Sequence, residues 1–320
     1  MSKMSIDRAA FAKTRAPMAR QSLNGSTMGT RYSAVFYAPT DTNVRKLESA
    51  LFAAVDRTDR QMSTWKPDSD LNQLNAAPVG TWVDTPRELM AVLAAALQVE
   101  QASHGAFDIS VGDIVSAWGF GPTRRRRGPD ARAELPATAR CAASQALELA
   151  TDQGKVRKVM PISLDLSGIA KGFGVDELAR VMEEFGIPSW LVGIDGEMRA
   201  KGTKPESTLW AVAHERPDRH VREAMGVIEL QDMAVATSGN YRHVVEVDGK
   251  AFSHTIDPRS ARPIENDVAS VTVLAPTCMA ADAWATAFMV MGADKALSCA
   301  RDRGFDVICV LQDGSVRSTL

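Results

Sequence analysis

The sequence is poor in the features that mark zinc-thiolate, membrane-spanning and nucleic-acid-binding proteins. Its four cysteines form no CxxC pair and have no histidine cluster nearby, which argues against a zinc site. No run approaches the roughly 18 consecutive apolar residues of a membrane helix. The 37 basic and 39 acidic residues nearly balance to a net charge of −2, so no overall field attracts nucleic acid or anionic lipid. We therefore expect buried free thiols and a small ligand that is bound locally.

The N-terminal twenty residues carry scattered charges and lack the apolar stretch of a signal peptide. Neither a secretory nor a twin-arginine signal is visible, so the sequence as given is expected to be cytoplasmic, or periplasmic if a leader has been removed. Residues 1–25 are predicted to form a disordered basic arm. Residues 26–320 are predicted to fold, because their length and the 45% hydrophobic content of the chain suffice for a core.

Periodicity predicts several helices and many closely spaced strands. Helices are expected over 42–61, 86–103, 279–291 and 293–303, and a strand, a turn and a helix over 164–185. Strands are expected from Thr27 to Tyr37 and over 189–194, 209–213, 226–230, 233–237, 243–247 and 268–274, with a hairpin turn at 312–315. Strands that follow one another closely favour antiparallel sheet, so the fold class is α+β rather than a βαβ array.

A glycine-rich segment over 118–122 precedes four consecutive arginines, Arg124 to Arg127. The arginines would be able to clamp a phosphate. Because glycine and proline surround them, a solvated loop is the favoured interpretation.

The helix expected over 279–291 carries an aspartate and a threonine four residues apart. Asp282 and Thr286 then share one face, and such an oxygen pair is half of a site that suits Mg²⁺. The ordinary alternative makes Asp282 a surface acid and Thr286 a core threonine bonded to its own helix. Spacing alone favours the ordinary alternative.

A histidine stands three residues before an aspartate in the run SHTIDP at 253–258. Imidazole titrates near neutral pH, so His254 is a candidate general base, and Asp257 is a candidate to orient it. The alternatives are a histidine bonded within a turn and an aspartate that begins a turn. The pattern alone favours the turn for His254 and leaves the two interpretations of Asp257 equal. The remaining histidines are expected to be structural or at the surface: His104, His214, His220 and His243.

Two glycines flank a lysine where the helix after residue 164 begins. Gly168 and Gly172 would let backbone amides approach a phosphate, helped by the helix dipole. Lys171 would then touch a pyrophosphate, although an exposed lysine is the commoner outcome. The spacing fits neither GxGxxG nor a Walker loop, so a Rossmann oxidoreductase is disfavoured.

Seven short motifs stand in order along the chain, and any one alone would be weak evidence. They are Met28-Gly29-Thr30, Met62-Ser63-Thr64-Trp65, Gly105-Ala106-Phe107-Asp108, the run DLSGIAKG at 165–172, Ala236-Thr237-Ser238-Gly239, the run HTIDPR at 254–259 and the run DAWAT at 282–286. Together they resemble the ApbE family, the FAD:protein FMN transferases. The resemblance covers nearly the whole folded chain, from Met28 to about Gly314.

The resemblance implies a two-lobed α+β architecture related to the T-fold, with mostly antiparallel sheets flanked by helices. Residues 26–320 would form this flavin transferase domain as two intertwined lobes, with the FAD site between them. The implied reaction is Mg²⁺-dependent transfer of FMN from FAD to a threonine or serine hydroxyl of a target flavoprotein. It makes a phosphoester bond and releases AMP. This sequence departs from the family pattern at Asp195, where glycine is usual, which adds a carboxylate and a Cβ near a close backbone approach.

The resemblance also implies roles for residues of this sequence. It supports His254 and Asp257 as the catalytic pair. It implies Mg²⁺ ligands at the Asp282 carboxylate, the Thr286 hydroxyl and the main-chain carbonyls of Ala170 and Ala285. Around the dinucleotide it places Met28, Trp65, Ala106, Phe107, Asp108, Ser167, Lys171, Phe173 and Ile256. Most of the apolar ones would serve equally as core, but Trp65 lies in a polar loop where burial is not otherwise demanded.

Two other functions fit the same residues. Given water instead of a protein hydroxyl, the site would be a Mg²⁺-dependent FAD pyrophosphatase that yields FMN and AMP. A non-catalytic FAD carrier or assembly factor is the second alternative, and the presence of both His254 and Asp282 argues against it.

Overall fold

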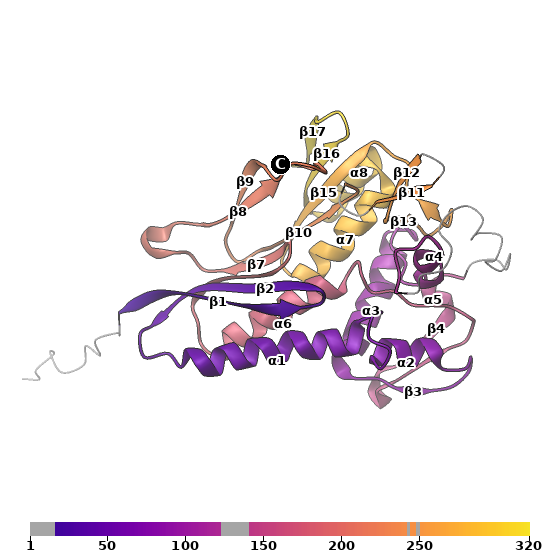
Figure 1. Ribbon diagram of the computed structural model, residues 1–320, viewed down its shortest axis with the longest axis horizontal. Coiled ribbons are helices and arrows are strands. Elements are labelled where there is room, and N and C mark those ends of the chain that lie inside the picture. The colour runs from indigo at the N-terminus through magenta and orange to yellow at the C-terminus, as the bar shows by residue number, and fades with distance from the viewer. Residues whose placement is uncertain (1–16, 123–140, 242–243, 248–249) are drawn as a thin grey trace, which may run out of the picture.

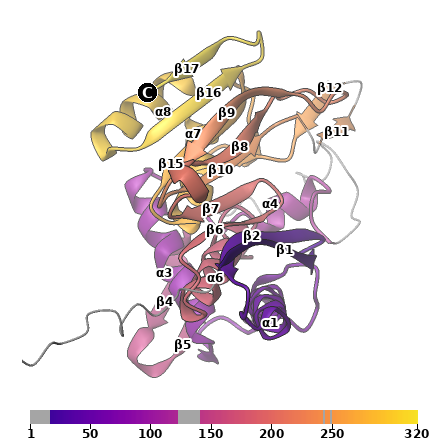
Figure 2. The same ribbon diagram turned by 90° about the vertical axis from the view of Figure 1, so that its left-hand side faces the viewer.

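The centre of the molecule is an eight-stranded sheet in which every neighbouring pair of strands is antiparallel. The computed structural model describes residues 17–122, 141–241, 244–247 and 250–320. In spatial order the strands are β1 (Met18–Thr27), β2 (Thr30–Pro39), β6 (Ser189–Ile194), β7 (Glu197–Lys201), β10 (Ala234–Gly239), β15 (Val268–Ala275), β16 (Asp306–Leu311) and β17 (Val316–Ser318). Figures 1 and 2 show helices packed beneath and beside this sheet.

Side chains alternate between the two faces of the sheet, as the two-residue period of a strand requires. Along β2, Tyr32, Ala34 and Phe36 are buried in a cluster with residues of α1 (Val44–Met62) and α6 (Ala170–Glu184). The intervening Val35 and Tyr37 pack with the hairpin of β8 (Trp210–Glu215) and β9 (Ala224–Leu230). Helices therefore cover one face and a hairpin covers the other.

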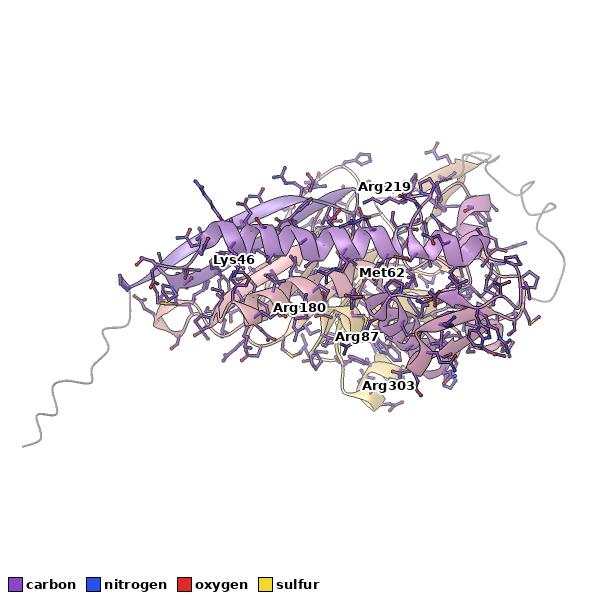
Figure 3. The ribbon with its side chains drawn as sticks, turned by 90° about the horizontal axis from the view of Figure 1, so that it is seen from below. Lys46, Met62, Arg87, Arg180, Arg219 and Arg303 are labelled. Atoms are coloured by element: carbon purple, nitrogen blue, oxygen red, sulfur yellow. The ribbon has the colours of Figure 1, made fainter. Side chains whose placement is uncertain are left out.

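Helix α1 illustrates how the sequence builds the helical layer. Asn43 caps it by accepting a hydrogen bond from the Lys46 N–H over 3.1 Å. Leu47, Leu51 and Val55 recur every three or four residues and are fully buried, each stabilising the fold by roughly 1.5–3 kcal/mol. Figure 3 shows the helix from below.

A second group of elements packs at the end of α1. It contains helices α2 (Asp70–Ala76), α3 (Arg87–Ala102), α4 (Gly112–Ala117) and α5 (Ala143–Ala146), and a small sheet of β3 (Val83–Asp84), β4 (Leu147–Ala150) and β5 (Lys155–Lys158). Its buried side chains form one cluster with those of α7 (Cys278–Met291), α8 (Ala293–Arg303) and β15. Two short ribbons, β11 (Val244–Val247) with β12 (Lys250–Ser253) and β13 (Ile256–Asp257) with β14 (Arg262–Pro263), complete the described elements. Helix α6 runs beneath β1 and β2 alongside α1, and α7 packs against the main sheet and against α3 (Figure 1).

The α+β class and its mostly antiparallel pairing are confirmed. The expected helices over 42–61, 86–103, 279–291 and 293–303 correspond to α1, α3, α7 and α8, and residues 312–315 join β16 to β17. All four cysteines are free thiols, with Cys278 and Cys309 buried and Cys141 and Cys299 partly exposed.

Two local predictions are wrong. The disordered arm expected over residues 1–25 is wrong for residues 18–25, which belong to β1 and pair with β2, and residues 1–16 lie outside the described part of the chain. No face of β1 is fully buried, so it lacks the apolar alternation that reveals a strand. The strand expected at Leu164 is also absent, since the Asn75 side chain binds both the N–H and the carbonyl of Leu164 in place of a neighbouring strand.

Two predictions concern residues outside the described part of the chain. Arg124 to Arg127 were expected to form a solvated loop, and His243 to be structural or at the surface.

Candidate active site

Two tight turns meet at one end of the main sheet. Met28 (φ 47°) and Gly29 (φ 71°) join β1 to β2, and Asp195 (φ 54°) lies in the turn that joins β6 to β7. The Asp195 N–H donates to the Arg31 carbonyl over 3.2 Å, which holds the turns side by side. The left-handed φ of Asp195 explains why glycine suits this position. The turn persists with aspartate, whose side chain is exposed.

The start of α6 lies against both turns. A methyl group added at Gly174 would come within 2.8 Å of Ile194 Cδ1 and 3.3 Å of Met28 Cε. Met28 thus contacts the first turns of α6, where a phosphate-binding amide cluster was predicted. Non-glycine residues with positive φ are uncommon, and such strain concentrates at functional sites.

Helices α6 and α7 cross so closely that only glycine fits at the contact. The Gly172 N–H donates to Asp282 Oδ2 over 2.9 Å. A methyl group at Gly172 would lie 2.4 Å from the Cys278 carbonyl oxygen. One turn earlier, a methyl group at Gly168 would lie 3.0 Å from Thr286 Oγ1. These two contacts bracket Ala170, so three of the four predicted Mg²⁺-ligand positions come together.

Asp176 fixes the start of α7 against α6. Its carboxylate accepts hydrogen bonds from the Cys278 and Met279 N–H groups, each over 2.9 Å, and from Arg199 over 2.8 Å. These are N-terminal amides that the helix itself leaves unsatisfied. Burial raises the pKa of Asp176, while these hydrogen bonds act in the opposite direction. Two carboxylates therefore hold the crossing by accepting from backbone N–H groups of the opposite helix: Asp282 from α6 and Asp176 from α7.

Three acids surround the ammonium group of Lys171. Its Nζ lies 2.7 Å from Glu197 Oε1 and 4.0 Å from Asp195 Oδ2. Burial alone would lower the pKa of Lys171, but the charges of Glu197 and Asp282 outweigh it and the pKa is raised. The side chain is thus ion-paired and partly buried, and the exposed lysine considered from the sequence is not what the structure contains.

Asp282 is only 5% exposed. Burial, followed by the charge of Glu197, raises the pKa of Asp282 to about 7, while Lys171 and the Gly172 amide act in the opposite direction. The surface acid considered from spacing alone is therefore excluded. A nearby cation would stabilise the charged form of this carboxylate.

Thr286 has a second hydroxyl beside it. The Oγ atoms of Ser238 in β10 and Thr286 in α7 are hydrogen bonded over 3.2 Å. The Thr286 hydroxyl thus bonds to a strand of the main sheet. Ser238 belongs to a sequence motif but had no predicted role.

His254 lies against an aromatic group. Its ring meets Phe120 edge-on with the centroids 6.2 Å apart, and Trp118 and Phe252 pack nearby with their centroids 5.2 Å apart. Ile256 is buried in the same cluster. The Asp257 carboxylate accepts hydrogen bonds from Arg259 Nε and Nη2, over 2.9 and 3.2 Å. A role for Asp257 in orienting His254 stays a prediction.

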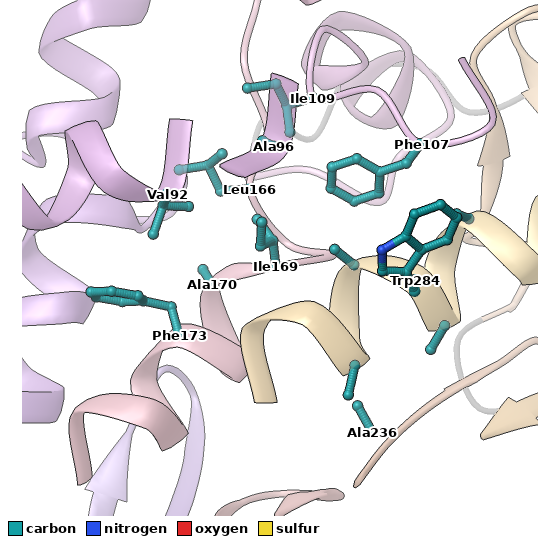
Figure 4. Close-up of a cluster of buried hydrophobic side chains, with 14 of the residues drawn as sticks. Val92, Ala96, Phe107, Ile109, Leu166, Ile169, Ala170, Phe173, Ala236 and Trp284 are labelled. Atoms are coloured by element: carbon teal, nitrogen blue, oxygen red, sulfur yellow. The ribbon is translucent and has the colours of Figure 1, made fainter. Parts of the chain in front are cut away.

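The predicted flavin residues differ sharply in exposure. Trp65 is 66% exposed, whereas Phe107 is 4% exposed and packs in the large cluster of Figure 4, near Trp284. Ala106, Phe173 and Ile256 are also buried, so they offer a ligand little surface. Two other predicted flavin residues form hydrogen bonds within their own loops. The Ser167 N–H donates to Asp165 over 2.7 Å, and Asp108 accepts from the Ser110 N–H over 2.8 Å.

Neither a metal cluster nor a membrane helix is found in the part of the chain that the structure describes. Among those residues, no three histidine, cysteine, aspartate or glutamate side chains are grouped to hold a metal ion. Within the same residues, no helix is both long and apolar enough to cross a bilayer.

Comparison with known proteins decides the family, because the model of the ApbE family matches residues 28–309. The chain belongs to the ApbE family. It is 35% identical to the FAD:protein FMN transferase of Klebsiella pneumoniae (91% of this chain and 84% of that protein), and 37% identical to that of Haemophilus influenzae (91% and 86%). The flavin transferase ApbE from Vibrio cholerae superposes with a TM-score of 0.83 at 32% identity, covering 94% of this chain and 97% of that one. This ApbE-family fold confirms the architecture inferred from the seven motifs.

Several residues of the site were not predicted from the sequence. Glu197, Asp176, Ser238 and Phe120 owe their importance to contacts between distant segments. Asp176 is typical, because an acid that caps another helix cannot be recognised until that helix is placed beside it.

Proposed function

We propose that this chain transfers the FMN half of FAD, with Mg²⁺, to a serine or threonine hydroxyl of a target flavoprotein and releases AMP. The enzyme class rests on relatives that are 35% and 37% identical over most of their length, and the chain is an FAD:protein FMN transferase. The observation that carries the finer proposal is the α6–α7 crossing, which gathers an oxygen-rich site beside a partly buried lysine.

The proposed reaction is a substitution at the FMN-side phosphorus of FAD. The acceptor hydroxyl oxygen forms a bond to that phosphorus, and the bond from phosphorus to the bridging oxygen breaks, so that AMP leaves with the bridging oxygen. His254 takes the proton of the hydroxyl, as a base that titrates near neutral pH is suited to do. Such transfers depend mainly on positioning and charge neutralisation.

The residues present suit a magnesium ion. Asp282, Thr286 and the carbonyls of Ala170 and Ala285 would hold it, an all-oxygen set of the kind that Mg²⁺ prefers. The Asp282 carboxylate is buried, and a cation at this point would stabilise its charged form. When bound, the ion would neutralise charge on the pyrophosphate.

FAD would bind across the same end of the sheet. Lys171 would face the pyrophosphate from the start of α6, and Met28 and Ser167 would lie beside it. The exposed indole of Trp65 would cover an aromatic ring of the dinucleotide. The 106–108 segment, with Phe173 and Ile256, would shape the walls of the site.

The proposal is tested by incubating the protein with FAD and Mg²⁺, with and without a flavoprotein domain that carries an acceptor threonine. Release of AMP together with an acceptor mass gain equal to FMN is expected. AMP and free FMN, with every acceptor tried left unmodified, would instead identify a pyrophosphatase. Tight FAD binding without AMP would identify a carrier.

A further inference from the structure

Glu197 carries a buried oxygen that the established family assignment does not explain. Glu197 is the first residue of β7, beside the turn that contains Asp195, and it is 3% exposed. Oε1 accepts from Lys171 Nζ over 2.7 Å. Oε2 is buried and has no hydrogen-bond partner among the described residues. A buried carboxylate oxygen without a donor is costly, so such an atom calls for a water or an ion.

The charges around this oxygen favour a cation. Arg199 pairs with Asp176, which leaves the Lys171 ammonium facing the carboxylates of Glu197, Asp282 and Asp195. One positive charge thus faces two buried negative charges, while solvent screens the third, on the exposed Asp195. A cation at this point would offset the excess of buried negative charge.

We propose that Glu197 is a positioning residue for the divalent cation, holding Lys171 with Oε1 and accepting a hydrogen bond from a cation-bound water with Oε2. The inference rests on the proposed function, because it assumes that the cation binds at Asp282. Mg²⁺ usually keeps several of its waters, and those waters are strong donors. Carboxylates that accept from such donors strengthen metal binding.

The proposal predicts opposite effects for the two members of the ion pair. Glu197→Gln keeps the shape of the side chain and removes one negative charge, so the Kd for Mg²⁺ should rise at least tenfold. Lys171→Gln removes the competing positive charge, so the Kd should fall severalfold. If the ion pair were purely structural, both substitutions would raise the Kd for Mg²⁺, because either one would loosen the site.

Asp195→Gly is the matched control. It also removes one carboxylate near Lys171, but an exposed one at 4.0 Å, where solvent screens the charge. Glycine also suits its left-handed φ of 54°. The Kd for Mg²⁺ should change less than twofold.

The experiment is calorimetric titration of Mg²⁺ into the FAD-free full chain, with melting temperatures recorded for each variant. Weaker binding by Glu197→Gln together with tighter binding by Lys171→Gln supports the proposal. Wild-type affinity in Glu197→Gln, or weakening by both changes, overturns it while leaving the transferase reaction intact. If Glu197→Gln does not fold, the direction of the Lys171→Gln effect decides. A wild-type protein that binds no Mg²⁺ overturns the magnesium part of the proposed function and this inference with it.

Discussion

The Gly172 N–H donates to Asp282 Oδ2 over 2.9 Å, and this single hydrogen bond joins the first turn of α6 to the second turn of α7. The two residues are 110 positions apart in the sequence. Around this bond lie the carboxylate, hydroxyl and lysine on which the proposed chemistry depends. Its geometry requires glycine, which makes the crossing testable.

Gly172→Ala should destabilise the protein. Its methyl group would lie 2.4 Å from the Cys278 carbonyl oxygen, so the helices must separate. Overpacking of this kind costs about 1–3 kcal/mol in the free energy of unfolding, which urea denaturation measures. Gly226→Ala is the control, because a methyl group there meets nothing within 4 Å. Equal stability of the two variants would contradict the close crossing.

Much of this arrangement could be predicted from the sequence. Apolar periodicity located α1, which buries one face, whereas α7 is buried on nearly all sides and was located by its helix-favouring alanines and methionines. The four-residue spacing placed Asp282 and Thr286 together. Seven ordered motifs indicated the family before any element was placed in space.

The rest depended on contacts that no local pattern records. Strand β1 has no buried face, so its pairing with β2 left no apolar alternation. Glu197 looks like an ordinary strand residue until the β6–β7 turn brings it to Lys171. Phe120 stands in a glycine-rich segment, and only the fold places it against His254.

His254→Ala should retain FAD affinity and slow transfer by roughly 10²- to 10⁴-fold, the usual effect of losing a general base. FAD binding is measured by fluorescence titration, and transfer by the mass of the acceptor. Phe305→Leu is the control, because it also removes an edge-on aromatic contact, but one away from the site. The ring centroids of Phe305 and Phe288 lie 6.1 Å apart. Weak FAD binding with normal turnover at saturation would make His254 a binding residue instead.

Trp65→Ala should weaken FAD binding without affecting stability. The indole is 66% exposed, so its removal costs the fold little, while a lost aromatic contact of about 1 kcal/mol raises the Kd roughly fivefold. Trp82→Ala is the matched control, because Trp82 is also exposed but stacks with Arg157 on the small sheet. An unchanged Kd for FAD in Trp65→Ala would remove this residue from the site.

His214 should make stability depend on pH. It is buried, its Nε2 lies 3.1 Å from Thr272 Oγ1, and burial lowers its pKa below the ordinary value of 6.5. The folded state then binds fewer protons than the unfolded state, so stability is present above pH 6.5 and is lost as the pH falls through the lowered value.

Melting temperatures recorded between pH 4 and pH 8 would reveal this dependence. His214→Gln should flatten the part of the profile below about pH 6.5. His220→Gln is the control at an exposed histidine and should leave the profile unchanged. Parallel profiles for the wild type and His214→Gln would show that the buried ring does not titrate in the way we infer.

The most direct test of the central claim is the acceptor mass produced by Asp282→Asn across a range of Mg²⁺ concentrations. The substitution keeps the shape of the side chain and an oxygen for the Gly172 N–H, but removes the charge that would hold the cation. We predict that the wild type adds one FMN to the acceptor and that the variant adds none at any Mg²⁺ concentration. Wild-type rates of FMN transfer by Asp282→Asn at limiting Mg²⁺ would contradict the account.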